Sequence, residues 1–279
     1  MHNGKFTYIA GARYQRVFGN NSLHIAGFGR HYKTEKEPDW TFKKLGDPES
    51  PLARYLPEIA EQAGVTTILA PSPVAFNGRI ITKSELTTRV ALWNGTCVYR
   101  NADKPADGVL LEPGEMYALS AAGCAVLIGW RINPHTREIV QVGVAHMGLE
   151  SLLNLVAANL LTALGDDPLH TYFSIEFAID AETLTYPWNH PEYKEKNKKR
   201  CIYIAEEFGV ECVPGFESEE ERKKGRVDIT AMGFAQLTRV GVPREHIESH
   251  SPVQGRDANF YHTRDGSGKR NLNTLTRLA

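Results

Sequence analysis

The chain has 279 residues, of which 42% are hydrophobic and 23% charged, and its formal net charge is −1. A charge balance this close to neutral gives no electrostatic reason to expect nucleic acid or an anionic membrane surface as a partner, and no stretch approaches the ~20 apolar residues of a membrane span. The N-terminus lacks the apolar core of a signal peptide, and the cysteines show no Cys-x-x-Cys spacing. Both features favour reduced thiols in a cytoplasmic protein.

Strands and helices alternate along the chain. The first half is predicted to contain short strands with glycine turns over 5–32, a charged loop over 33–50, a helix from Pro51 to Gly64, a buried strand over 65–70, strand material within 84–99, and strands at 106–111 and 115–121. The second half adds a hairpin over 124–146, a helix over 148–164, an aromatic-rich strand over 171–179, a helix over 228–240 and a short strand over 245–248. This alternation favours an α/β (α+β) fold in one compact domain spanning 1–279.

The predicted hairpin carries the most informative residues. Two apolar runs, 124–131 and 139–146, flank the turn-forming Asn133-Pro134. Side-chain alternation places Cys124 with the bulky residues of the first strand and His146 with those of the second. Pairing about His135 would bring the two directly opposite each other. A thiol and an imidazole brought together can form a nucleophile with its base, or half of a metal site.

The residues after His146 open a strongly apolar helical pattern at Gly148. A helix N-terminus beside the pair favours a thiolate or a bound anion. Near the C-terminus, Arg264 and Arg270 flank a glycine-rich turn, and arginines beside glycine backbone are suited to binding a phosphate or carboxylate.

Three further segments suggest a family. Ala106-Asp107-Gly108, Gly123-Cys124-Ala125 and Ala145-His146-Met147-Gly148 resemble, in order and rough spacing, motifs of the bacterial YfiH-type laccase-domain proteins, also labelled multicopper polyphenol oxidoreductase-like. The C-terminal run Phe260-Tyr261-His262-Thr263-Arg264-Asp265-Gly266 through Arg270 resembles that family's closing motif. The resemblance covers about the last two-thirds of the chain and implies mixed β-sheet layers flanked by helices.

The resemblance also implies an activity and a site. The family's zinc site has three ligands; Cys124 and His146 match two of them, and Asn94, in Leu92-Trp93-Asn94-Gly95, stands at the position of the third, a histidine. Zinc is therefore a possible cofactor. The implied substrates are a purine nucleoside and phosphate, with Arg264, Arg270 and Asp107 as substrate-binding residues.

Three functional hypotheses remain open at this point. The leading one is phosphorolysis or deamination of purine nucleosides at a metal-dependent site of Cys124 and His146. The second is a metal-free Cys–His hydrolase or amidase in which Cys124 is the nucleophile, His146 the base and Asn94 the group that orients the imidazole. The third is a catalytically degenerate member that binds a small ligand or another protein. The oligomeric state is not predicted.

Overall fold

The computed structural model describes residues 9–32, 35–36, 38–71, 76–100, 105–250, 257–262 and 266–278. Its larger sheet has seven strands, in the order β1-β2-β15-β10-β5-β8-β7. These strands are β1 (Tyr14–Phe18), β2 (Leu23–Phe28), β15 (Asn271–Arg277), β10 (Glu115–Ala121), β5 (Thr67–Leu69), β8 (Cys97–Arg100) and β7 (Thr88–Ala91). The pairings of β5 with β10 and β8 are parallel and the others antiparallel, so the sheet is mixed.

The second sheet has six strands, in the order β14-β13-β11-β12-β9-β6. These strands are β14 (Ile247–His250), β13 (Thr171–Glu176), β11 (Ala125–Ile132), β12 (Ile139–Met147), β9 (Gly108–Leu111) and β6 (Ile80–Ile81). A separate small pair is formed by β3 (His31–Tyr32) and β4 (Glu35–Lys36).

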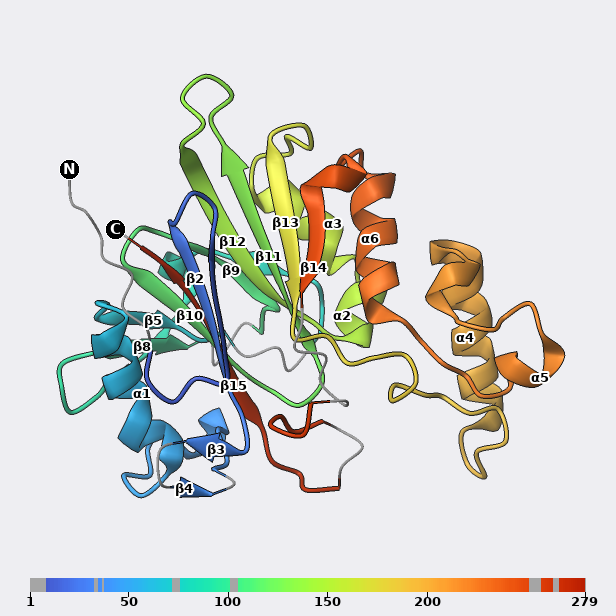
Figure 1. The fold of residues 1–279 in the computed structure, drawn as a ribbon, viewed down its shortest axis with the longest axis horizontal. Coiled ribbons are helices and arrows are strands. Elements are labelled where there is room, and N and C mark those ends of the chain that lie inside the picture. The colour runs from blue at the N-terminus through green and yellow to red at the C-terminus, as the bar shows by residue number, and fades with distance from the viewer. Residues whose placement is uncertain are drawn as a thin grey trace.

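The helices are α1 (Pro51–Gln62), α2 (Leu149–Leu153), α3 (Val156–Ala163), α4 (Lys194–Phe208), α5 (Glu219–Arg222) and α6 (Ile229–Arg239). They cover the outer faces of the two sheets, except for α4 and α5, which lie beyond α6 and away from the sheets (Figure 1). Helix α1 buries its apolar face against the seven-stranded sheet, and α2, α3 and α6 pack on the six-stranded sheet. Residues of both sheets, such as Leu119 and Val144, meet in a core between them. No helix in the described part of the chain combines the length and the apolar character that crossing a membrane requires.

The predicted α/β (α+β) class, with mixed sheets flanked by helices, is confirmed. Two predicted elements differ: the strand expected over 245–248 begins only at Ile247, after a 3-10 turn, and the helix over 148–164 is two helices, α2 and α3. Leu155 between them has φ +60°, the left-handed region that interrupts a helix. The apolar periodicity carries no signal of this break, because both helices bury the same face against β11 and β12.

The β11–β12 hairpin forms with a register two residues away from the predicted one. Val126, rather than Cys124, lies opposite His146. Because side chains alternate with a period of two, a shift of two residues leaves every side chain on its predicted face. Cys124 and the bulky residues of β11 and β12 therefore still face the core between the sheets.

Candidate functional site

Cys124 lies in the connection between the two sheets. Strand β10 of the larger sheet ends at Ala121, and β11 of the smaller sheet begins at Ala125. Between them Gly123 has φ +99°, a conformation that favours glycine and that lets the chain change direction here. The thiol is thereby placed at the junction of the two sheets, where it is only partly buried.

His146 comes to the same point from the end of β12 and lies beside the Cys124 thiol, on the same side of Gly148. The next turn begins at Gly148, and an ideal Cβ there would lie 2.8 Å from Cε1 of His146, 3.1 Å from its Nε2 and 3.4 Å from Sγ of Cys124. Only a residue without a side chain leaves room for this approach. Gly148 thus has a steric role in addition to its predicted place before a helix.

Asp107 and Ser151 hold the opposite side of the imidazole. Nδ1 of His146 lies 3.3 Å from Oδ1 of Asp107 and 3.1 Å from Oγ of Ser151, and the Ser151 hydroxyl donates to the same carboxylate oxygen at 2.8 Å. The other oxygen, Oδ2, accepts from the backbone N–H of Gly78 at 2.6 Å. With Nδ1 engaged in this way, Nε2 is the ring atom left to face the thiol.

The place of Asp107 corrects its predicted role in substrate binding. The residue is 1% exposed and does not line the pocket that contains Cys124. It lies behind His146, because β9 runs next to β12 and the His146 N–H donates to the Asp107 carbonyl at 2.7 Å. Asp107 is therefore placed to orient the imidazole and does not line the pocket.

The electrostatics of the pair favour a thiolate and an imidazolium. Burial alone would raise the pKa of the Cys124 thiol, but His146 and Arg270 together lower that pKa below its ordinary value. Burial disfavours a charged His146, yet the Cys124 thiolate and the hydrogen bond to Asp107 raise the pKa of His146. The two shifts have one cause, since each charge stabilises the other.

The pair opens into a pocket of about 350 Å³. Its walls include backbone and side chains of the β10–β11 connection, and Phe76 covers the imidazole, with 5.6 Å between the two ring centroids. Phe76 is 39% exposed and has φ +45°, an unfavourable conformation for a bulky residue. Asn154 helps to hold it there, because its side chain donates to the Phe76 carbonyl at 2.8 Å.

Three cations line the same pocket: Lys43, Arg100 and Arg270. The half-buried Arg100 donates to the Phe42 carbonyl at 3.0 Å, but its Nε has no partner, and burial lowers its pKa. Arg270 directly precedes β15 and is placed in the pocket as predicted. Arg264 lies outside the described residues. The pocket thus combines a partly buried thiol with groups suited to binding an anion.

The structure places Asn94 elsewhere. It lies in the turn between β7 and β8, where its Nδ2 donates to the Pro57 carbonyl of α1 at 3.0 Å and its Oδ1 accepts from the Thr96 N–H at 3.1 Å. The prediction that Asn94 reaches the Cys124–His146 pocket is therefore wrong. Phe76 takes that place instead. The turn-forming pair Asn77-Gly78 directly after it was the one sequence signal that could have marked this segment.

The residues at the pair do not fit a protein-held zinc ion. Such a site needs three or four ligands, and Cys124 and His146 supply two. The nearby Asp107 uses both carboxylate oxygens in hydrogen bonds behind the imidazole. Over the part of the chain that the structure describes, no three His, Cys, Asp or Glu side chains converge in a way that could hold a metal ion.

Comparisons with known proteins support the fold. No protein-family model and no curated protein sequence matches this chain. Among solved structures, YlmD from Geobacillus stearothermophilus is similar over 94% of each chain, with a TM-score of 0.63 and 18% identity. The hypothetical protein YfiH of Bacillus licheniformis is similar over 93% of this chain and 94% of its own, with a TM-score of 0.62 and 16% identity. Neisseria meningitidis protein NMB0706, assigned to the family DUF152, is similar over 95% of this chain and 99% of its own, with a TM-score of 0.65 and 16% identity. The predicted YfiH-like fold is confirmed.

Proposed function

We propose that this protein is a divergent member of the YfiH-type laccase-domain family that acts as a cysteine-dependent hydrolase or amidase on a small anionic substrate. The observation that carries the proposal is the chain of contacts from the Cys124 thiol through the His146 ring to Asp107 and Ser151. A nucleophile, a base and a group that orients the base are the parts that thiol-dependent acyl transfer requires.

The reaction would follow from these positions. The Cys124 thiolate attacks the carbonyl carbon, a C–S bond forms, and the electron pair of the C=O bond moves to oxygen. When the intermediate collapses, the bond to the leaving amine or alcohol breaks, and the His146 imidazolium donates its proton to that group. Neutral His146 then removes a proton from water, which attacks the thioester, releases the acid and regenerates the thiolate. Asp107 holds the imidazole orientation throughout.

The cations of the pocket specify the kind of substrate. Arg100 is half-buried with an unpartnered Nε, and Arg270 and Lys43 line the same walls. A buried guanidinium is stabilised by a carboxylate or phosphate that accepts its hydrogen bonds. The substrate would place such a group against these cations and its carbonyl against Cys124, while Phe76 covers the reacting atoms.

The direct test is turnover of a panel of small amides and esters that carry a carboxylate or phosphate. Release of ammonia, amine or alcohol would be measured for the native protein, for Cys124→Ser and for Cys97→Ser, whose thiol lies in β8, outside the pocket. The proposal predicts turnover by the native protein and by Cys97→Ser, with an acylated Cys124 peptide in the mass spectrum. Equal turnover by Cys124→Ser would refute it.

A second candidate is action on purine nucleosides, by phosphorolysis or deamination. The aromatic ring of Phe76 beside the pair favours it, because a base can stack on such a ring, and the pocket's cations suit phosphate. The shared fold adds support by analogy only. Inosine and adenosine, tested with phosphate and with or without added zinc, separate the two candidates. Nucleoside turnover that depends on zinc would favour this reading and count against the metal-free hydrolase.

A further inference from the structure

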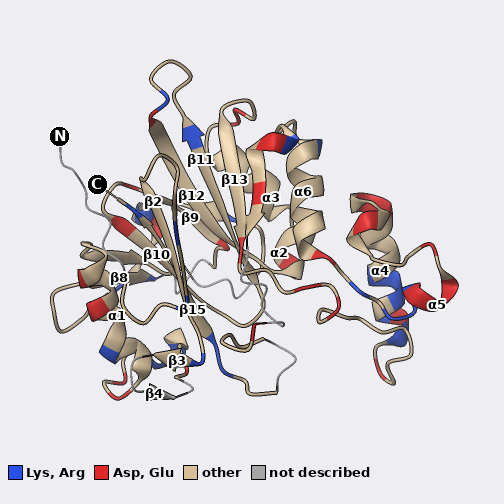
Figure 2. Cartoon of the chain, in the orientation of Figure 1, with Lys and Arg blue, Asp and Glu red and all other residues tan. Residues whose placement is uncertain are grey.

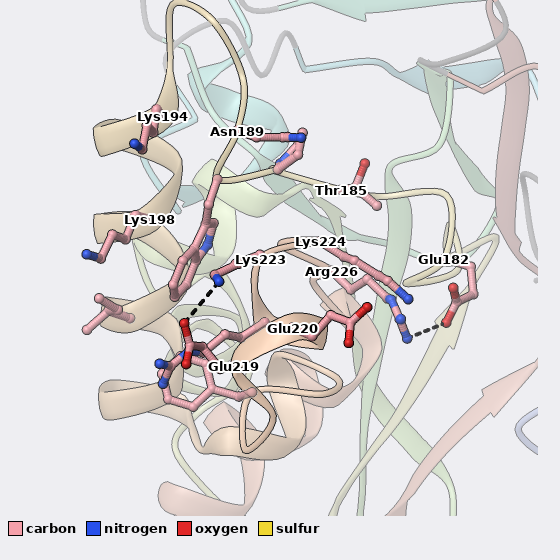
Figure 3. A pocket seen from close by; sticks show the side chains of 15 residues that line it. Glu182, Thr185, Asn189, Lys194, Lys198, Glu219, Glu220, Lys223, Lys224 and Arg226 are labelled. Carbon is pink, nitrogen blue, oxygen red and sulfur yellow. Dashed lines mark hydrogen bonds and ion pairs between the residues drawn. The ribbon is translucent and has the colours of Figure 1, made fainter.

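A second and larger cavity lies away from Cys124. It measures about 1010 Å³ and lies between the 182–189 segment, the first turns of α4, and α5 with the residues around it (Figure 3). None of its lining residues belongs to the Cys124 pocket. Its volume is at the upper end of the range common for small-molecule sites.

The floor of this cavity is held by backbone hydrogen bonds. Tyr186 N–H donates to the Gly225 carbonyl at 2.7 Å, and Trp188 N–H donates to the Lys223 carbonyl at 2.9 Å. Gly225 has φ +64°, and a Cβ there would lie 1.9 Å from the Tyr186 carbonyl oxygen. The two segments can approach this closely only with glycine at that position. The position of this part of the cavity wall is therefore determined by the fold.

One wall of the cavity is apolar. Trp188 is 9% exposed, and Ile202 and Phe216, partly exposed, lie in the same lining. Ile202 and Phe216 also pack against the core under α4 and α6, which fixes their positions. Such a wall suits a flat, apolar part of a ligand.

Two cations flank the ring of Trp188, and one of them, Arg222, also interacts electrostatically with Glu219. Lys198 Nζ lies 5.9 Å and the Arg222 guanidinium 5.8 Å from the ring centroid. Among the described residues neither side chain makes an ion pair, and Nε of Arg222 is buried without a hydrogen-bond partner. An anionic group bound beside the ring would be attracted to both cations.

Most acidic groups of the lining are already neutralised. Glu219 pairs with Lys223 and Glu182 with Arg226, each at 3.0 Å. Lys194, Lys198 and Arg222 then outnumber the remaining acid, Glu220. Figure 2 shows this concentration of basic residues on the turns that begin α4. The excess positive charge therefore lies beside the apolar wall.

From this arrangement we infer a second binding site, for a small ligand that combines an aromatic ring with a doubly charged anionic head such as a phosphate. The ring lies against Trp188, Ile202 and Phe216, and the head accepts hydrogen bonds from Arg222, Lys198 and Lys194. The site is independent of the chemistry at Cys124, because the two cavities share no residue.

Calorimetric titration with three matched probes tests both halves of the inference: phenyl phosphate, inorganic phosphate and phenol. Phenyl phosphate should bind saturably and more tightly than either fragment. Arg222→Gln and Lys198→Gln should each weaken it by about tenfold, as expected for loss of a charge-assisted hydrogen bond. Lys199→Gln, exposed on α4 but outside the lining, is the matched control and should bind as the native protein does.

A further variant locates the binding. Arg270→Gln removes a cation of the Cys124 pocket, so phenyl phosphate bound there would be weakened, whereas the binding that depends on Arg222 and Lys198 should persist. Loss of binding in Arg270→Gln with none in Arg222→Gln and Lys198→Gln would place the ligand at Cys124 and overturn the inference. Absence of saturable phenyl phosphate binding up to about 10 mM would overturn it as well.

Discussion

His146 Nδ1 and Asp107 Oδ1 lie 3.3 Å apart, with the Ser151 hydroxyl bridging them. This contact joins β12 to the start of β9, two neighbouring strands of the six-stranded sheet. It fixes the orientation of the imidazole before any substrate arrives, so that Nε2 faces the Cys124 thiol. In the proposed mechanism, the reactivity of Cys124 depends on a residue that does not line the pocket.

Replacing Asp107 should lower reactivity as well as stability. Asp107→Asn keeps the size of the side chain but removes the charge that stabilises the imidazolium. Its NH₂ group also replaces an oxygen that accepts a hydrogen bond, so that two donors face each other there. We expect the alkylation rate of Cys124 by iodoacetamide to fall by about tenfold or more, and the free energy of unfolding by about 1–3 kcal/mol. Urea unfolding and alkylation kinetics measure the two effects. An unchanged alkylation rate in a folded variant would show that Asp107 does not act on the pair.

Gly148→Ala tests the close approach of thiol and imidazole. The added Cβ would lie 2.8 Å from the His146 ring, so the ring must shift away from Cys124. Gly148 has φ −90°, which an alanine adopts without strain, and the fold should persist. We expect slower alkylation of Cys124 and a modest loss of thermal stability, because the displaced imidazole is buried and hydrogen bonded.

Gly46→Ala is the matched control for that substitution, because a Cβ at Gly46 would meet nothing within 4 Å and no positive φ is required there. In this variant Cys124 should be alkylated at the same rate as in the native protein. If Gly148→Ala does the same, the imidazole contact is not what activates the thiol.

Negatively charged reagents test the cations of the pocket. The rate ratio of iodoacetate to iodoacetamide at Cys124 should exceed the ratio for a free thiol, because Arg270, Arg100 and Lys43 attract the carboxylate. Arg270→Gln and Arg100→Gln should each reduce this ratio several-fold, and added salt should reduce it in the native protein. Arg137→Gln, in the exposed turn between β11 and β12, should leave it unchanged. A ratio that none of these changes affects would contradict an anion-binding pocket.

The stability of the fold should fall in acid through His24. Burial lowers the pKa of this residue to about 4 from an ordinary value of 6.5. The unfolded chain therefore takes up the proton first, and the stabilisation present above pH 6.5 is lost as the pH falls towards 4. His24→Gln, which cannot titrate, should show a shallower decline in the free energy of unfolding over that interval. If the free energy of unfolding, measured with urea, declines equally in the native protein and in His24→Gln, then groups other than His24 cause the acid sensitivity.

Much of the fold and part of the site follow from local patterns. Alternation along β11 and β12 is sufficient to put Cys124 and His146 on one face, and it survives the register error because that error is an even number of residues. Proline at the start of a helix and glycine after its end mark α1 closely. The α/β class follows from the alternation of elements alone.

The remaining features depend on long-range packing, which such patterns do not encode. Asn94 matches a motif by spacing, but the turn that carries it lies beside α1. Phe76 reaches His146 only because β6 pairs with β9, a contact between segments far apart in sequence. The cavity beside α4 requires two distant segments to pair through Gly225.

The measurement that tests the central claim most directly is the pH dependence of iodoacetamide alkylation at Cys124, followed by peptide mass spectrometry. Because His146 lowers the pKa of this thiol, the rate constant should fall less steeply between about pH 8 and pH 6 than that of an ordinary thiol, which slows by about tenfold for each pH unit. The buried Cys212, whose pKa burial raises to about 12, should remain unmodified in the folded protein. A tenfold decline per unit at Cys124 would contradict an activated thiolate and, with it, the proposed hydrolase.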